Sequence, residues 1–161
     1  MALGDITLYD EGAFGYPGDV EYAVAASATL IYPGEPVAKA LGGAAVTPAA
    51  TNTPVVATDF YAGIATSTST NTAGAAGTVK VMKFVPGVSY LITPNSAAAF
   101  DTQAEYDALV GDRVLFDLTT GVYTILATDG ATSGLVILPL DIKKYPGKVR
   151  FAIRAAVNYL A

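Results

Sequence analysis

Glycine and proline divide this chain into short segments. The 161 residues include 16 glycines and nine prolines, and the apolar runs between them are brief. Both residue types interrupt helices and favour turns. Short apolar runs bounded by turn residues are typical of β-strands, since helices need about ten or more residues. The sequence therefore predicts an all-β chain, and its length suits one domain.

The expected strands follow from these runs. Residues 78–84 alternate most clearly, with Val79 and Val81 on one face and Lys80 and Met82 on the other. We expect residues 42–54 and 66–77 to be loops, the second a mobile loop or hairpin crossover of small and polar residues. The predicted strands cover residues 6–9, 21–25, 29–32, 35–41, 60–65, 78–84, 88–92, 113–117, 122–126 and 135–139.

One short helix is predicted over residues 100–111. Thr102 and Glu105 have the spacing of a capping box, in which each side chain accepts a backbone N–H of the first turn. Gly111 is placed to end the helix in a left-handed conformation. A helix of this length needs packing against the rest of the domain to be stable.

The last segment fits two patterns. As a strand it turns Val149, Phe151 and Ile153 inward, and as a helix it forms a stripe of Val149, Ile153, Val157 and Leu160. We favour a strand through about residue 155, because β-branched and aromatic residues are frequent there. The predicted fold is a small β-barrel or β-sandwich with one short helix and an extended N-terminal arm. It has three parts: residues 1–33 as arm and first strands, 34–140 as barrel core, and 141–161 as a basic C-terminal strand or helix.

The missing residue types exclude many active sites. The chain has no Cys, His or Trp, which rules out thiolate zinc sites, Cys nucleophiles, Ser-His-Asp triads and HExxH metal sites. The net charge of −5 lacks the basic footprint that nucleic acid requires. No apolar run approaches the about 20 residues of a spanning helix, and the start lacks a signal-peptide pattern. We expect no nucleic-acid or membrane partner, and synthesis in the cytoplasm.

Other chemistries are poorly supported. Asp19 with Glu21, and the acids at 101–107, are potential carboxylate pairs, but acids at a helix start are ordinarily capping groups. No calcium-loop pattern is present. Residues 74–80 carry two glycines and Lys80 but lack the Gly-Lys-Ser/Thr ending of a phosphate loop. The tyrosines have no local group to lower their pKa. We therefore expect no enzyme, cofactor or metal.

Charge is distributed unevenly. Residues 1–35 carry six acids and no base, whereas residues 141–161 carry five bases and one acid. The two ends can attract each other within one subunit or between neighbouring subunits. The low charge of 14% and the 10 tyrosines suit a surface covered by other subunits. A bland surface rich in Ala and Thr is the alternative.

A series of short motifs runs through the chain. They are Gly34-Glu35-Pro36-Val37, residues 60–65 and 73–81, Val110-Gly111-Asp112-Arg113-Val114-Leu115-Phe116-Asp117, and residues 120–124 and 134–138. In this order the motifs resemble the capsid cement (head decoration) proteins of tailed bacteriophages, which share a "G-E-x-V" start, a "v-G-I-A" strand, a glycine loop before a valine strand and a "G-D-x-V-y-x-D" hairpin. The resemblance covers roughly residues 34–138 and departs from the pattern in residues 1–33, 94–106 and from Lys143 onward.

The resemblance implies a structural protein of the virion surface. Such proteins bind outside the assembled head, usually as trimers, and hold neighbouring major capsid protein subunits together without catalytic residues. For this chain we expect capsid or inter-subunit contacts through the arm and the basic end, at Ile6, Leu8, Tyr9, Tyr16, Tyr22, Lys148, Arg150 and Arg154. The alternatives are another virion subunit (shell, tail or spike) and a β-module that binds carbohydrate or a cell surface.

Overall fold

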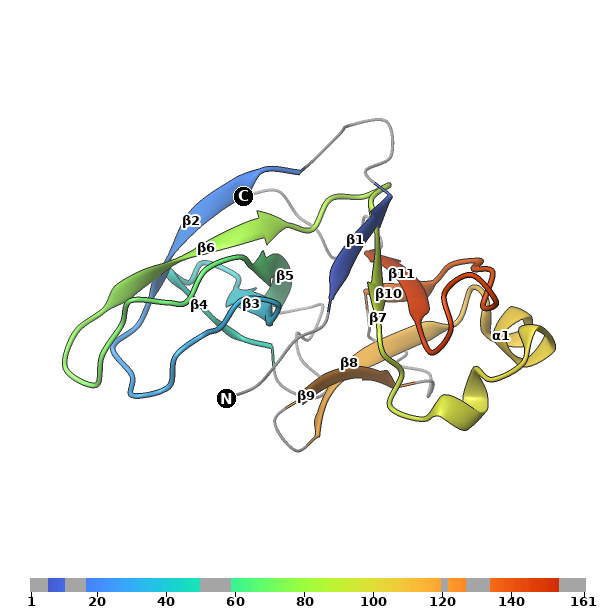
Figure 1. Cartoon of the computed structure of the whole chain (residues 1–161). Helices are drawn as coiled ribbons and strands as arrows, with labels where there is room; N and C mark the ends of the chain where they lie inside the picture. Colours follow the sequence, from blue (N-terminus) through green and yellow to red (C-terminus); the bar gives the residue numbers. More distant parts are fainter. Residues whose placement is uncertain (1–5, 11–16, 50–58, 120–121, 127–133, 154–161) are drawn as a thin grey trace.

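A computed structural model of the chain consists of two β-sheets and one short α-helix (Figure 1). It describes residues 6–10, 17–49, 59–119, 122–126 and 134–153. The all-β class expected from the sequence is confirmed. No helix in these described ranges is long and apolar enough to cross a bilayer.

The first sheet is a closed five-stranded barrel. Its strands follow the order β2 (Asp19–Val24), β4 (Ala45–Pro48), β3 (Pro36–Ala40), β5 (Asp59–Ala65) and β6 (Gly77–Lys83). Only the β2–β4 pair is parallel. Small and β-branched side chains fill the interior, because a barrel this narrow leaves little room. They are Val24, Ile31, Val37, Val46, Ala62, Ala65, Val79 and Val81.

The second sheet has six antiparallel strands and curls back on itself. The order is β1 (Thr7–Asp10), β7 (Ser89–Ile92), β11 (Val149–Ile153), β10 (Leu135–Ile137), β8 (Arg113–Thr119) and β9 (Val122–Leu126). Beyond β7 the chain reaches the far strand β9. There the N–H of Ile125 donates to the carbonyl of Thr93 at 3.1 Å, and the N–H of Asn95 to the carbonyl of Ile125 at 2.8 Å. This leaves β1 as the sheet's edge strand beside β7.

A shared aromatic core joins the two sheets. Tyr61 of the barrel meets Phe116 of β8 edge-on at 5.2 Å between ring centroids. Phe84, just after β6, lies 4.9 Å from Tyr90 and 6.3 Å from Phe151. Edge-to-face pairs of this kind contribute roughly 0.5–1.5 kcal/mol beyond their area burial. The barrel and the six-stranded sheet are therefore packed on one another.

The predicted helix forms over a shorter range than residues 100–111, and the predicted C-terminal strand forms as far as residue 153, where the described residues end. In α1 (Gln103–Leu109) the Thr102 hydroxyl accepts the N–H of Glu105 at 3.3 Å, and the Glu105 carboxylate accepts the N–H of Thr102 at 3.2 Å. Gly111 follows with φ of +94°. A short 3-10 turn, η2 (Ala97–Ala99), precedes the helix. Residues 149–153 form strand β11, which decides between the two patterns for these residues.

Each of the two sheets draws its strands from more than one of the three expected segments. Strand β1 of the arm and strand β11 of the basic end both belong to the six-stranded sheet, while the barrel takes residues between 19 and 83. Two local predictions were wrong. Residues 42–54 contain strand β4, which Val46 anchors in the barrel interior. Residues 29–32 form no strand, because Ile31 bonds instead to Ser69.

Residues 66–76 connect the antiparallel strands β5 and β6, as the hairpin alternative expected, and they make hydrogen bonds to residues 27–31. The Ser69 hydroxyl accepts the N–H of Ile31 at 2.8 Å and donates to the Asn71 side-chain oxygen at 2.6 Å. The Asn71 amide donates to the carbonyls of Ser27 and Thr29 at 2.8 and 3.0 Å. Both polar side chains are buried. Their hydrogen bonds satisfy backbone groups that no strand partner reaches.

Candidate interaction site at the edge of the six-stranded sheet

Strand β1 brings three of the predicted contact residues to one sheet edge. Thr7 pairs with Leu91 and Leu8 with Tyr90, and a bulge follows at Tyr9. Ile6 is buried in the shared core, and Leu8 and Tyr9 are half-buried against it. A bulge adds one residue to a strand and re-aims its side chain. Here the bulge places Tyr9 beside β11, the strand that lies on the other side of β7.

Arg150 of β11 contacts β1 and its surroundings through each part of its guanidinium. Its Nη2 lies 3.6 Å from the Asp10 carboxylate, and its Cζ lies 4.5 Å from the centre of the Tyr9 ring. Its Nε donates to the Ser89 hydroxyl at 3.0 Å, and its Nη1 to the carbonyl of Pro139 at 3.2 Å. Planar guanidinium suits such combined stacking and hydrogen bonding. These contacts define what we call the Arg150 site.

The Arg150 site joins the acidic front of the sequence to its basic end. Asp10 belongs to the acidic front and Arg150 to the basic end, and the two pair within one chain. The Arg150 side chain is 22% exposed and the Asp10 side chain 55%. An ion pair this exposed contributes little by itself. The stacking on Tyr9 therefore matters more for holding β1, while the bond to Ser89 of β7 fixes the position of the Arg150 side chain.

A second aromatic ring extends the site. The Tyr9 and Tyr145 rings meet edge-on with centroids 5.2 Å apart. Lys144 places its ammonium 5.4 Å from the centre of the Tyr145 ring. Cations over ring faces are attracted by the ring quadrupole. The contacts thus run from Arg150 through Tyr9 and Tyr145 to Lys144, with the two tyrosines between the two cations.

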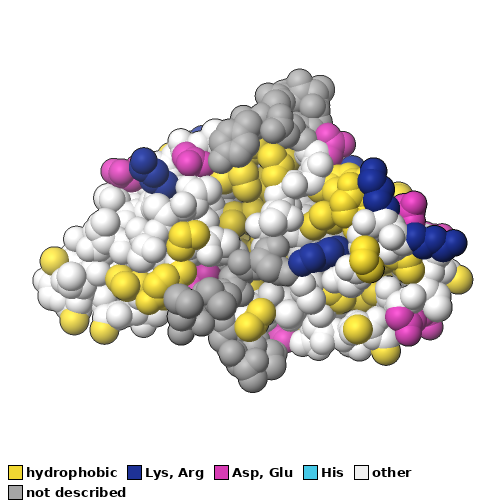
Figure 2. Space-filling view, in the orientation of Figure 1, with side chains coloured by type: hydrophobic (Ala, Val, Ile, Leu, Met, Phe, Trp, Pro, Cys, Tyr) yellow, Lys and Arg dark blue, Asp and Glu magenta, His cyan; other side chains and the backbone are white. Residues whose placement is uncertain are grey.

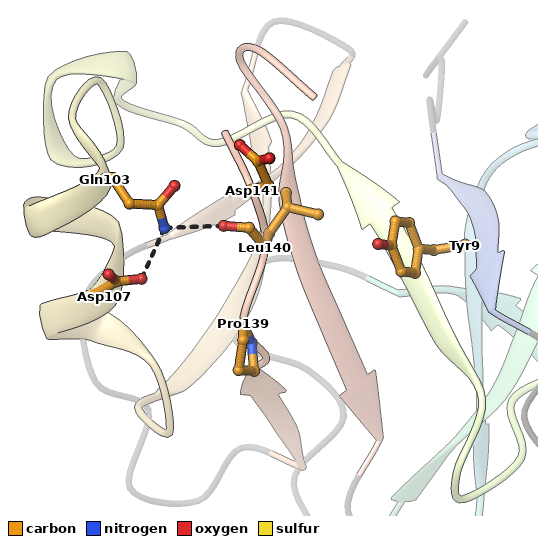
Figure 3. A pocket seen from close by; sticks show the side chains of 6 residues that line it. All are labelled: Tyr9, Gln103, Asp107, Pro139, Leu140 and Asp141. Carbon is orange, nitrogen blue, oxygen red and sulfur yellow. Dashed lines mark hydrogen bonds between the residues drawn. The ribbon is translucent and has the colours of Figure 1, made fainter. Parts of the chain in front are cut away.

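Next to Tyr9 lies an open hollow of about 420 Å³ (Figure 3). The Gln103 amide donates to the Asp107 carboxylate at 2.7 Å and to the carbonyl of Leu140 at 3.0 Å, and its oxygen accepts the N–H of Ile142 at 3.2 Å. Gln103 therefore ties α1 to the segment before β11. The hollow is lined by Tyr9, Gln103, Asp107, Pro139, Leu140 and Asp141.

The remaining predicted contact residues lie elsewhere. Tyr22 is on β2 of the barrel, half-buried against the barrel interior, and burial raises the pKa of its hydroxyl. Lys148 donates from Nζ to the Thr93 hydroxyl at 3.1 Å, which ties the start of β11 to the end of β7. Tyr16 and Arg154 lie outside the described residues. The structure therefore groups Ile6, Leu8, Tyr9 and Arg150, and separates Tyr22 from them.

Sequence reasoning missed two groups at this edge. The buried hydroxyl of Ser89 accepts a hydrogen bond from the Arg150 side chain. The hydroxyl of Tyr106, on α1, accepts the backbone N–H of the same arginine. Neither follows a recognisable motif. Their roles depend on β7, α1 and β11 meeting in space, which no local spacing indicates.

Three of the carboxylates considered for chemistry have structural partners. Glu105 belongs to the capping box, Asp107 bonds to Gln103, and Asp19 accepts the Thr66 hydroxyl at 3.1 Å. Within the part of the chain that the structure describes, no three metal-ligating side chains gather in one place.

The described surface has little continuous apolar area. Among the described residues the large hydrophobic side chains that stand exposed are Leu41 and Val122. Figure 2 shows hydrophobic atoms in separate groups, with acidic and basic side chains mixed at both ends of this face. Most of the large buried side chains belong to the two cores.

No protein-family model, curated protein or solved structure matches this chain.

Proposed function

We propose that this chain is a structural protein of a tailed-phage virion, a capsid decoration protein that binds the outside of the head. Its partners are the major capsid protein and its own copies, in a homotrimer, and it stabilises contacts between capsid subunits. The motifs of residues 34–138 and the all-β fold support this proposal. The role is binding, not turnover.

The observation that carries the proposal is the edge strand β1. It pairs with β7 on one side and ends the sheet order on the other. A strand at a sheet edge is able to join a neighbouring protein's sheet, since backbone hydrogen bonds place few demands on side chains. Many copies on one particle multiply weak contacts of this kind.

A carbohydrate-binding module is the second candidate, and the hollow beside Tyr9 favours it. An aromatic ring, an amide and two carboxylates line that hollow, and such groups recognise sugars. However, both polar atoms of the Gln103 amide already have partners in the molecule, and the Tyr9 ring stacks with Arg150. The decoration role therefore has the stronger support.

Co-sedimentation with heads tests the proposal. Heads assembled from the major capsid protein of the same phage are mixed with the full chain and pelleted. We expect saturable binding and heads that resist heat better. Arg150→Glu should weaken binding, more so at low salt, because it reverses the charge at the Arg150 site. Lys143→Glu makes the same charge change on an exposed side chain and should bind as the parent does.

The possible outcomes test head binding and the role of β1 separately. A full chain that stays in the supernatant at every concentration, while a glycan panel gives binding, contradicts the decoration role and favours the second candidate. Equal binding by Arg150→Glu and Lys143→Glu shows that heads are bound through another face, which contradicts the proposed role of β1.

A further inference from the structure

Strands β1 and β2 are consecutive in the chain but belong to different sheets. β1 ends at Asp10 and pairs in the six-stranded sheet, whereas β2 begins at Asp19 and pairs in the barrel. The eight residues 11–18 join them. Such a connection can span at most roughly 26–29 Å. β1 is thus joined to the rest of the molecule by one covalent link and by the contacts at its docking site.

The docking site of β1 is built entirely from later parts of the chain. The register partners Ser89, Tyr90 and Leu91 supply the backbone pairing, and Arg150 and Tyr145 contact Tyr9. Arg150 also meets Asp10 with opposite charge. None of these contacts depends on which copy of the chain supplies the strand.

We propose that β1 exchanges between copies, so that the strand of one molecule docks on β7 and the Arg150 site of a second. An identical strand finds identical hydrogen bonds, ring contacts and charge complementarity, and only the path of the connection changes. Exchange of one element between copies is a low-cost route to association because it creates no new interface chemistry. Inside one molecule the strand competes at high effective concentration, so exchange grows with protein concentration.

This inference does not rest on head binding. It concerns purified protein, and a positive result would leave the capsid partner to its own test. If both hold, exchanged strands would link neighbouring copies on the head surface.

Disulfide trapping tests the exchange, since the natural chain has no cysteine. Thr7 and Leu91 are direct register partners. Residues opposed in an antiparallel pair have Cα atoms about 4.5–5.5 Å apart, which suits a disulfide.

Thr7→Cys is made in a tagged chain and Leu91→Cys in an untagged chain. The two are mixed at high concentration, incubated and oxidised. The control mixture replaces Leu91→Cys by Thr70→Cys, an exposed position on the barrel.

We expect the Thr7→Cys and Leu91→Cys mixture to give a tagged–untagged disulfide dimer in several-fold excess over the control mixture, rising with protein concentration. A yield equal to the control at every concentration overturns the proposal. The double variant T7C/L91C, oxidised at high dilution, checks the docking site itself. It should close within one chain, and failure to close would show that β1 does not dock on β7 at all.

Discussion

The phenolic oxygen of Tyr106 accepts the backbone N–H of Arg150 at 2.9 Å. The same hydroxyl donates to the carbonyl of Leu138 at 2.9 Å, while the N–H of Leu138 donates directly to the carbonyl of Arg150. The hydroxyl thus replaces one missing ladder bond where β10 and β11 diverge. Through it, helix α1 is attached to the strand that carries the Arg150 site.

Tyr106→Phe should destabilise the protein by about 2–4 kcal/mol. It removes one oxygen and leaves the part-buried N–H of Arg150 and carbonyl of Leu138 without their partner, and each unsatisfied group costs about 1–3 kcal/mol. Urea unfolding measures the change. Tyr145→Phe, on a half-buried ring outside this ladder, is the control and should stay within about 0.5 kcal/mol of the parent. Equal midpoints for the two variants would contradict the bridging role.

Alkaline pH should unfold the protein in part through Tyr106. Burial raises the pKa of its hydroxyl to about 12 from its usual value of 10.0. The unfolded chain therefore releases this proton at lower pH than the folded chain does. The free energy of unfolding contributed by Tyr106 is complete below pH 10 and is lost as the pH rises toward 12. Unfolding curves from pH 8 to 12 should fall less steeply for Tyr106→Phe than for the parent.

Tyr123→Phe should have the opposite effect on stability. The Tyr123 side chain is fully buried, yet its hydroxyl has no hydrogen-bond partner among the residues that the structure describes. Burial, with the nearby Glu35 carboxylate second, raises its pKa. Removing a hydroxyl that is desolvated without a bond should raise the free energy of unfolding by about 1 kcal/mol. A loss as large as that of Tyr106→Phe would mean that the hydroxyl has a partner after all.

Local patterns predicted those elements whose cause is local. The capping box of Thr102 and Glu105 needs only neighbouring residues, and the alternation of Val79, Lys80 and Val81 follows from the two faces of one strand. Met82 shows where this reasoning stops, since it faces away from the valines and is also buried. The opposite face of β6 is covered by the shared core at Met82 but exposed at Lys80, a difference that strand alternation cannot reveal.

The Arg150 site depends on long-range topology. Asp10 and Arg150 meet because β7 pairs with β1 on one side and with β11 on the other. The charge distribution indicated that acidic and basic ends attract, but left open whether one chain or two supplied them. Strand β4 was missed for a related reason, since its sequence is short and weakly β-forming and the closed barrel supplies its partners.

Glu35→Gln should stabilise the protein at neutral pH but not in acid. Glu35 is 2% exposed, and its carboxylate accepts the N–H of Tyr32 at 3.1 Å. Burial raises its pKa above the usual 4.5, partly offset by that hydrogen bond. The folded chain thus holds this proton more tightly than the unfolded chain. The parent is penalised once the pH rises through the raised pKa, and the penalty is absent below the unfolded value.

Urea unfolding of the parent and of Glu35→Gln at several pH values tests whether the pKa of Glu35 is raised. Glutamine keeps an oxygen for Tyr32 and carries no charge, so its advantage in urea midpoint at pH 7 should shrink as the pH falls to 4 and below. An advantage that stays constant, or grows in acid, contradicts a raised pKa at Glu35.

Gly77→Ala should destabilise the protein by about 1–3 kcal/mol, the usual range for forcing atoms into a packed site. A Cβ at position 77 would collide with the backbone of Thr70 and Asn71. That backbone carries the Asn71 side chain, whose amide bonds to Ser27 and Thr29, so the collision should disturb the whole seam between residues 66–76 and 27–31. Gly74→Ala is the matched control, since its Cβ meets nothing within 4 Å. Amide exchange at Ile31, measured with urea unfolding, should speed up in Gly77→Ala alone. Equal protection in both variants would mean that residues 66–76 are not packed against this seam.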